Sequence, residues 1–483
     1  MDNLEAMTLE EKVRYYFEGM VVNKNSMLHV FKDYNIPSFI RDWFLKRYGD
    51  KNGEINTNYL QQRMQEIMPS QNQWNGILEA IINQNQHVKI LAKINVIPIL
   101  KEGNIAFELP TYGLTSNETF IDSDVIEKHR KVLLSGAKDI WGVLTLGARN
   151  FGKKKTELKV TLEDFVSFRP YQVDLSYYKS IREQFTLEEW MDVLLEAIDY
   201  NASGFSEFKE KHMLLTRLLP FLEKRLNLIE LAPKGTGKSY VYSQISKYGW
   251  LNSGGVMTRA KLLYDMAKKQ EGLIPNYDFV VLDEIKTIRF TDEHEMQAAL
   301  KGYLENGRYT VGIKEGKADA GVILLGNIPQ EKMRTDIDFI STLSNIFSDS
   351  AVLDRFHGFI EGWHIPRMSE DKKVNGWAIN SEYLAEIFHA LRDDITYRTI
   401  VDQLLIIPEG ADTRDIEAIK RLTTSYHKLF FPHWVDLDDI NTELYENYCL
   451  KPALSMRSII KTQLGFIDIE YRHKEVPKVK IQG

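Results

Sequence analysis

Hydrophobic positions along the chain follow two spacings, which predict helical and strand-rich regions. In the first ~85 residues, apolar side chains recur every three or four positions, as on one face of a helix. Thr8, followed by Glu11, has the pattern of a helix capping box. From there to about residue 180 the apolar residues alternate as in strands, with one helical stretch at 123–134. About five strands with one helix suit a small barrel of the OB type, and other small α+β domains fit the pattern equally well.

The remaining residues have the order of elements typical of an α/β core followed by helices. A short apolar segment at 227–231 precedes a glycine-rich loop, and strands and helices alternate from there to about residue 330. Beyond Phe356 the pattern is mostly helical to about residue 465. The polar residues after it are expected to be poorly ordered.

Composition and charge narrow the class of protein. The 483 residues are 43% hydrophobic and 27% charged, typical of a folded globular chain. A formal net charge of −7 excludes a protein that is basic all over but leaves room for a locally basic surface. Cys449 is the one cysteine, so no intrachain disulfide can form, and the sequence has neither a signal-peptide pattern nor a membrane-length apolar run. We expect a cytoplasmic protein without membrane association.

The clearest chemical motif is a glycine-rich loop between a buried strand and a helix. It contains Pro233, Lys234, Gly235, Thr236, Gly237, Lys238 and Ser239. Its glycines let backbone N–H groups face a phosphate, and the helix N-terminus adds its positive dipole end. Lys238 can neutralise the β- and γ-phosphates and Ser239 can ligate Mg²⁺, so the motif predicts a site for ATP and Mg²⁺. Ala232 replaces the first glycine of the usual pattern, a minor departure because the later glycines form most of the cradle.

A pair of carboxylates forms the second motif. Asp283 and Glu284 follow directly after the apolar strand expected at 279–282. Asp283 would hold the Mg²⁺ shell, and Glu284 would polarise the attacking water. The alternative is a core strand that runs into an acidic cap. Beside a phosphate-binding loop, the pair favours ATP hydrolysis.

Three further polar residues are candidates for the same chemistry. Asn327 ends another apolar strand and can orient the lytic water, although an Asn after a strand is commonly a turn residue. Arg355 lies in an apolar stretch, where its charge needs a partner. That partner is either a neighbouring subunit's γ-phosphate, as for an arginine finger, or Asp354 or Glu361 of the same chain. Arg414 begins a helix and either closes over the nucleotide or is a solvated helix arginine.

Two cationic turns are candidates for contact with nucleic acid. The segment 307–325 predicts a β-hairpin whose tip carries Lys314 and Lys317 and which would point into the channel of a ring. Lysines there would meet DNA phosphates without reading the base sequence. The β-rich domain has a second cationic turn, with Arg149, Lys153, Lys154 and Lys155. Lysine-rich turns are often only solvated tips, so both interpretations remain open.

With these motifs placed, the chain resembles the BrxL family, the Lon-like AAA+ ATPases of BREX phage-exclusion systems. The resemblance spans roughly residues 15–465, and its DRFH and GW segment is not a generic ATPase pattern. It rests on the glycine loop and on SGG (253–255), DFVVLDEI (278–285), GNI (326–328), DSAVLDRFHGFIEGWHIPRM (349–368) and TRDIEAIKRL (413–422). The family's core is similar to that of minichromosome-maintenance helicases. There an RF pair carries the arginine finger, matching Arg355, and an arginine-led helix carries sensor 2, matching Arg414.

The resemblance implies a hexameric ring, single or stacked as two rings, with double-stranded DNA in its channel and other phage-defence components as partners. Longer family members continue into a Lon-type protease domain. Only 18 residues follow Gly465, so we expect a short form without protease activity. The predicted parts are a helical region (1–85), a β-rich OB-like DNA-binding domain (86–180), an α/β P-loop AAA+ core (181–365), a helical lid with sensor 2 (366–465) and a tail (466–483).

The leading hypothesis is therefore an ATP-hydrolysing ring that binds DNA in anti-phage defence, as a translocase or helicase-like motor. One alternative is a protein unfoldase or chaperone that works with a separate protease. Another is a DNA-binding scaffold that uses ATP as a switch. An unfoldase usually has an aromatic pore loop, whereas the hairpin expected here bears lysines and has Tyr309 back on its strand, which favours DNA.

Overall fold

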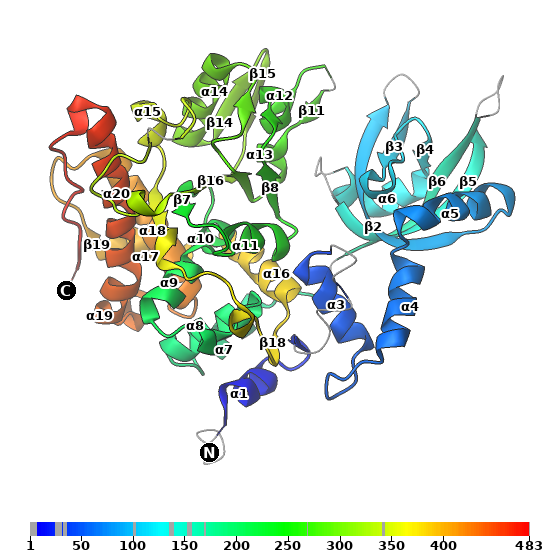
Figure 1. The fold of residues 1–483 in the computed structure, drawn as a ribbon, viewed down its shortest axis with the longest axis horizontal. Helices are drawn as coiled ribbons and strands as arrows, with labels where there is room; N and C mark the ends of the chain where they lie inside the picture. The colour runs from blue at the N-terminus through cyan, green and yellow to red at the C-terminus, as the bar shows by residue number, and fades with distance from the viewer. Residues whose placement is uncertain are drawn as a thin grey trace. The chain divides into compact units, whose positions relative to one another are not determined.

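The chain forms two compact units of mixed helices and sheets, which confirms the predicted α/β class (Figure 1). The larger unit comprises residues 1–47, 51–53 and 171–483, and the smaller comprises 48–50 and 54–170. The computed structural model describes residues 7–24, 31, 36–99, 103–134, 140–151, 157–168, 171–267, 269–340 and 343–482.

A five-stranded parallel sheet forms the centre of the larger unit, in the order β17-β7-β16-β12-β8. The strands are β7 (Leu228–Ala232), β8 (Gly249–Ser253), β12 (Phe279–Asp283), β16 (Gly321–Asn327) and β17 (Gly358–Glu361). Every residue of β7 and β12 is buried, which explains their continuous apolar runs. Because all neighbours are parallel, the segments that follow β7, β16 and β12 leave the sheet at one edge.

Helices surround this sheet, as Figure 1 shows. Before the last strand they are α7 (Leu175–Arg182), α8 (Leu187–Ala197), α9 (Phe208–Thr216), α10 (Leu219–Leu222), α11 (Lys238–Gln244), α12 (Arg259–Leu262), α13 (Leu273–Asn276), α14 (Glu293–Asn306) and α15 (Ser350–Leu353). After it come α16 (Ser381–Arg392), α17 (Thr396–Leu404), α18 (Thr413–Phe430), α19 (Thr442–Tyr445) and α20 (Lys451–Ile467). Within the described ranges, none of the helices combines the length and apolar character needed to cross a membrane.

Short antiparallel pairs extend from this core. The hairpins are β10 (Tyr264–Asp265) with β11 (Gln270–Glu271), and β14 (Arg308–Val311) with β15 (Lys314–Lys317). Near the C-terminus, β20 (Lys480–Ile481) pairs with β19 (Leu405–Ile406), and Val479 is buried. The expected poor order of the whole tail is therefore wrong, because a strand formed elsewhere in the chain supplies hydrogen-bond partners for its end. A parallel pair joins β9 (Val256–Met257) to β13 (Arg289–Phe290).

The described residues among the first 47 belong to the larger unit. The predicted capping box is confirmed: Thr8 caps α1 (Leu9–Tyr16), and Glu11 returns the bond. Strand β1 (Val21–Asn23) pairs with β18 (Trp377–Ile379). The helices that follow are divided between the units, with α3 (Ser38–Tyr48) largely in the larger one and α4 (Thr57–Ile67) and α5 (Gln71–Asn83) in the smaller. The helical region expected at 1–85 is thus shared, because periodicity predicts helices but not the surfaces on which they pack.

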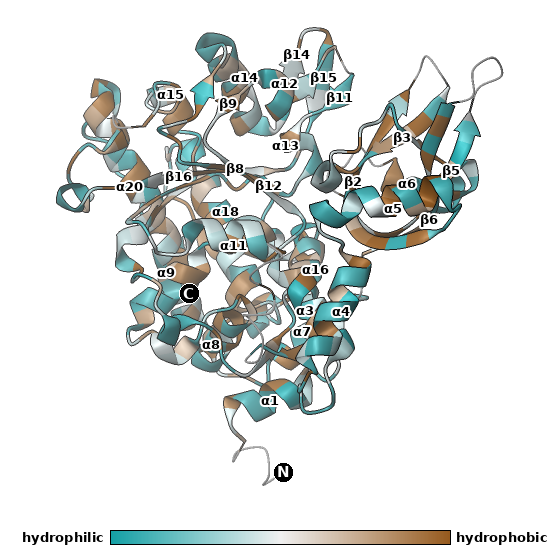
Figure 2. Cartoon of the chain, turned by 45° about the vertical axis from the view of Figure 1, so that its right-hand side comes forward, coloured by the Kyte–Doolittle hydropathy of each residue, from teal (hydrophilic) through white to brown (hydrophobic). Residues whose placement is uncertain are grey.

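Besides α4 and α5, the smaller unit contains a five-stranded sheet, in the order β3-β2-β5-β6-β4, and one further helix. Its elements are β2 (Val88–Ile99), β3 (Asn104–Glu108), β4 (Thr119–Ile121), α6 (Ser123–Leu133), β5 (Ile140–Phe151) and β6 (Glu157–Ser167). Strand β4 is parallel to β6, and the other sheet pairs are antiparallel. The Thr119 hydroxyl accepts from the Phe107 N–H (3.0 Å), which joins β4 to β3. Figure 2 shows hydrophobic residues along β6, while α4 is mainly hydrophilic.

Candidate nucleotide-binding site

Hydrogen bonds to backbone carbonyls fix the glycine loop between β7 and α11. Gly235 and Gly237 have φ values of +83° and +72°, a region that favours glycine. The Met368 N–H donates to the Gly235 carbonyl (2.8 Å), and the Arg217 guanidinium donates to the Thr236 carbonyl (2.8 Å). The C=O and N–H of a planar trans peptide point in opposite directions, so the next N–H groups face the concave side of the loop. Such groups at a helix N-terminus form an anion site.

Four predicted site residues meet at this edge of the sheet. Lys238 Nζ donates to Asn327 Oδ1 (2.8 Å), and Ser239 Oγ donates to Asp283 Oδ2 (2.5 Å). They come together because β16, which carries Asn327, lies between β7 and β12. Burial lowers the pKa of Lys238, an effect that nearby Asp283 opposes. The hydroxyl and carboxylate oxygens are hard ligands that fit Mg²⁺.

Glu284, directly after Asp283, has a strained backbone conformation. Its φ is +52°, in the left-handed region that non-glycine residues rarely adopt. The conformation is held by the Glu284 N–H, which donates to Asp283 Oδ1 (2.7 Å), and by the Glu284 carbonyl, which accepts from the Thr287 N–H (2.7 Å). The side chain is exposed, whereas Asp283 is buried. Backbone strain of this kind is common where a side chain must be aimed at a ligand.

A fully buried ion pair beneath the loop was not predicted from sequence. Glu230, in the middle of β7, pairs with Arg217 (2.6 Å), and both side chains have no exposed surface. The same guanidinium donates to the Thr236 carbonyl, so the pair links β7 to the glycine loop. Burial by itself lowers the pKa of Arg217, but the Glu230 carboxylate reverses that shift, and the net change is upward. In the sequence, the one feature that could have indicated this ion pair is the charged Glu230 within an otherwise apolar strand.

Replacing Glu230 with glutamine is expected to lower the free energy of unfolding by about 3–5 kcal/mol, because the Arg217 charge is left buried without its counter-charge. Urea denaturation measures the effect, with the exposed Glu409→Gln as the matched control. Equal stability of the two variants would contradict a structural role for the pair.

Arg355 lies at the opposite edge of the sheet from the glycine loop. It precedes β17, which runs parallel to β7, with Gly358 opposite Leu228. Asn227, just before β7, donates from its side chain to the Arg355 carbonyl (3.4 Å). From Asn227 to Pro233 the chain rises about 20 Å at about 3.3 Å per residue, more than an arginine side chain spans. Arg355 therefore cannot reach the glycine loop of its own subunit in this arrangement.

The charge of Arg355 is paired within the chain, with an unexpected partner. Its Nε lies 2.6 Å from Glu305 Oε2, at the end of α14, rather than beside Asp354 or Glu361. Arg414, at the start of α18, contacts the same Glu305 oxygen (3.4 Å) and Asp354 Oδ2 (3.1 Å). The structure thus brings Arg355 and Arg414 together, away from the cluster around Lys238.

A second buried arginine organises the backbone beside this pair. Arg457 of α20 has no exposed side-chain surface and contacts Asp354 (2.6 Å) and Asp415 (2.7 Å). These two carboxylates are the chain neighbours of Arg355 and Arg414. Sequence reasoning missed Arg457, because one arginine in a long amphipathic helix has no local signature.

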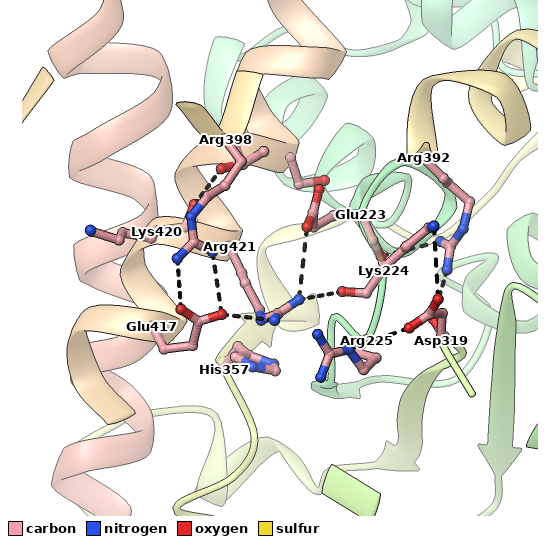
Figure 3. Close-up of polar contacts among 12 residues, drawn as sticks. Glu223, Lys224, Arg225, Asp319, His357, Arg392, Arg398, Glu417, Lys420 and Arg421 are labelled. Atoms are coloured by element: carbon pink, nitrogen blue, oxygen red, sulfur yellow. Dashed lines mark hydrogen bonds and ion pairs between the residues drawn. The ribbon is translucent and has the colours of Figure 1, made fainter. Parts of the chain in front are cut away.

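Polar contacts join α18 to α17 and to the segment that leads into β7 (Figure 3). Glu417 contacts both Arg398 (2.7 Å) and Arg421 (2.7 Å), and Arg421 donates to the Lys224 carbonyl (2.6 Å). Burial, together with Arg421, holds the pKa of His357 well below its usual range, so the ring is neutral and accepts from the Asn227 N–H (2.9 Å). The middle of α18, at Arg421, is therefore joined to the segment that precedes β7.

The hairpin expected near 307–325 is present as β14 and β15, but its tip differs from the prediction. Val311 pairs with Lys314 and Arg308 with Lys317, so Gly312 and Ile313 form the turn. Lys314 adjoins the tip and lies over the Tyr264 ring (5.3 Å), whereas Lys317 is at the open end. Placing both lysines at the tip was wrong, because the sequence does not specify which residues turn. Tyr309 lies on β14, as expected, and its side chain is buried.

The cationic turn of the smaller unit is described only in part. Arg149, on β5, pairs with Asp122 (2.9 Å) and lies 3.5 Å from Glu163. Its charge is therefore shared with two carboxylates, although the side chain is half exposed. Lys153, Lys154 and Lys155 lie outside the described residues.

The parallel sheet, its glycine loop and the polar residues at neighbouring strand ends place the larger unit in the class of α/β domains that bind ligands at the carboxyl ends of their strands. Residues 160–477 match a family described as "Lon-like protease BrxL-like, ATPase domain", and residues 15–147 match "BREX system Lon protease-like protein BrxL N-terminal". The chain therefore belongs to the BrxL family, which confirms the resemblance found in the sequence.

Two relatives are similar along nearly the whole chain. "Lon-like protease BrxL" of Escherichia coli O9:H4 (strain HS) is 26% identical over 486 residues, covering 97% of this chain and 67% of the relative. The protein of the same name from Bacillus cereus (strain H3081.97) is 27% identical over 500 residues, covering 98% and 71%.

Proposed function

We propose that this protein is an Mg²⁺-dependent AAA+ ATPase that assembles into a ring, binds DNA and acts in BREX-type phage defence. One observation carries the proposal. Lys238, Ser239, Asp283 and Asn327 converge at one edge of the parallel sheet, while Arg355 is fixed at the other. Each subunit therefore carries one half of a nucleotide site, with Lys238, at one surface. It carries the complementary half, with Arg355, at another surface.

Each residue at the P-loop edge has a distinct role in this proposal. The inward N–H groups and Lys238 bind the phosphates, and Ser239 and Asp283 hold Mg²⁺, which neutralises charge on the transferred phosphoryl group. Glu284 polarises the attacking water, and Asn327 orients it. Mg²⁺-dependent ATP turnover that is lost on addition of EDTA tests this part of the proposal.

The ring follows from the position of the two arginines. Arg355 and Arg414 share Glu305 at one surface, so a single contact with the next subunit brings both toward its γ-phosphate. Such head-to-tail contacts close into rings when the rotation permits, and we propose a hexamer. Electron microscopy with duplex DNA and a non-hydrolysable ATP analogue tests it. Closed rings are expected, and monomers or open filaments would contradict the arrangement.

The smaller unit supports DNA binding through its topology. Five strands with one helix before β5, and a parallel β4–β6 pair, have the connectivity of the OB barrels that bind nucleic acids. We propose that this unit and the β14–β15 hairpin both meet the DNA backbone. The family description, which names the BREX system, supports a role in phage defence.

Removing the hairpin charges with Lys314→Gln and Lys317→Gln is expected to weaken binding to unrelated duplexes about equally. The slope of log affinity against log salt should fall by roughly one unit for each lost phosphate contact. The exposed lysines Lys451 and Lys478 provide a matched double variant that should keep the wild-type slope. An unchanged slope in the hairpin variant would remove the hairpin from the DNA interface.

One observation favours the unfoldase alternative. Ile313, at the hairpin tip, is 94% exposed, and an apolar tip suits a polypeptide better than a phosphate backbone. If the protein is an unfoldase, Ile313→Ser should abolish stimulation of ATP turnover by unfolded protein. A DNA motor predicts no such stimulation, with or without the substitution.

A further inference from the structure

Glu305 is the carboxylate that Arg355 and Arg414 share, and Arg414 also contacts Asp354 (3.1 Å). Glu305 Oε2 lies 2.6 Å from Arg355 Nε and 3.4 Å from Arg414. Among the described residues, neither arginine has a hydrogen-bond acceptor for its buried Nε. The Glu305 contact with Arg355 is therefore an ion pair without a well-directed hydrogen bond, and both guanidinium groups retain donor capacity.

The other carboxylates nearby already have stronger partners. Asp354 contacts the fully buried Arg457 (2.6 Å), and Glu417 contacts Arg398 and Arg421 (2.7 Å each). Glu305 differs because its contacts are with the two arginines proposed to serve the next subunit. It is also 40% exposed, so an incoming group can reach it from solvent.

A cavity of about 130 Å³ opens beside these side chains. Its lining includes Glu305, Arg355, Arg414 and Glu417. A water molecule occupies about 30 Å³ of the liquid, so the space admits a group of several non-hydrogen atoms. A terminal phosphoryl group, with oxygens that accept from guanidinium donors, has suitable chemistry for a place next to both arginines.

We propose that Glu305 holds Arg355 and Arg414 in a resting position, from which the γ-phosphate of the adjacent subunit's nucleotide must displace it. The inference rests on the proposed ATPase ring and adds a positioning residue to it. In the resting subunit Glu305 neutralises the cations, which keeps two guanidinium groups from facing each other unpaired. When the phosphate arrives, its charge replaces that of the glutamate.

Glu305→Gln tests this inference, because glutamine keeps the shape and removes the charge. The Kd of a non-hydrolysable fluorescent ATP analogue, measured on assembled protein, should fall about two- to fivefold, as expected for the loss of a half-exposed competing ion pair. Glu295→Gln is the matched control, since Glu295 lies on the same helix and pairs with Arg259 (2.6 Å). It should leave the Kd unchanged.

A second measurement distinguishes an effect of Glu305 through the two arginines from a purely structural role of this residue. In a background with both Arg355→Ala and Arg414→Ala, Glu305→Gln should have no effect on the Kd, because the groups through which it acts are absent. Thermal unfolding verifies that each variant is folded, and Glu305→Ala serves as a second charge-free variant.

Distinct outcomes overturn the inference and the proposed function. An unchanged or weaker affinity in both Glu305 variants, with binding still dependent on Lys238, overturns the role of Glu305 alone. An increase in affinity on Glu305→Gln that persists in the Arg355→Ala and Arg414→Ala background also overturns the role of Glu305. Analogue binding that does not depend on Lys238 overturns the proposed nucleotide site and this inference with it.

Discussion

ATP turnover by Arg355→Ala is expected to fall by about 10³-fold or more, the scale that arginine fingers contribute. The guanidinium acts on charge that develops on the phosphoryl group in the transition state, so the loss should lie mainly in kcat. Steady-state ATPase assays measure it, and the exposed Arg334→Ala, which loses only a pair with Asp336, is the control.

An experiment with mixed variant subunits tests whether Arg355 acts on the nucleotide of a neighbouring subunit. Arg355→Ala and Lys238→Ala are each expected to be inactive, but a mixed ring contains interfaces that pair an intact glycine loop with an intact finger. With random exchange in head-to-tail rings, about a quarter of the sites should be restored. Rings that exchange subunits without regaining activity would show that Arg355 is structural, as its pair with Glu305 allows.

Glu284→Gln is expected to reduce ATP hydrolysis by at least ~100-fold while preserving nucleotide binding. Glu284 is exposed and makes its described contacts through the backbone, so glutamine should leave the fold and the phosphate loop intact. Lys238→Ala should instead abolish tight binding, since the phosphates lose a nearby counter-charge. Binding assays with the ATP analogue and turnover assays distinguish the two defects.

Glu293→Gln is the control for Glu284→Gln. It makes the same change, from carboxylate to amide, at an exposed residue of helix α14. Equal loss of binding in Glu284→Gln and Lys238→Ala would contradict the assigned roles. Full hydrolysis by Glu284→Gln would move the water-activating role to another residue.

The position of the glycine loop and of the polar residues beside it could be predicted from local sequence. A glycine loop placed directly between strand and helix can curl in few ways, and parallel strands deliver Asp283 and Asn327 to the same edge. The structure joins them through Lys238–Asn327 and Ser239–Asp283 contacts. Their catalytic roles remain predictions, which the variants above test.

The sequence alone determined the α/β class, the family and the residues of the glycine loop, because each is written in short segments or in one-dimensional periodicity. The tertiary structure decided which charges meet. Glu305, Arg355, Arg414 and Arg457 are far apart along the chain, and the partner of each charged side chain depends on how α14, α18 and α20 lie against the segment between α15 and β17. The same reason explains the division of the first 85 residues between two units, since local spacing specifies a helix but long-range packing selects its surface.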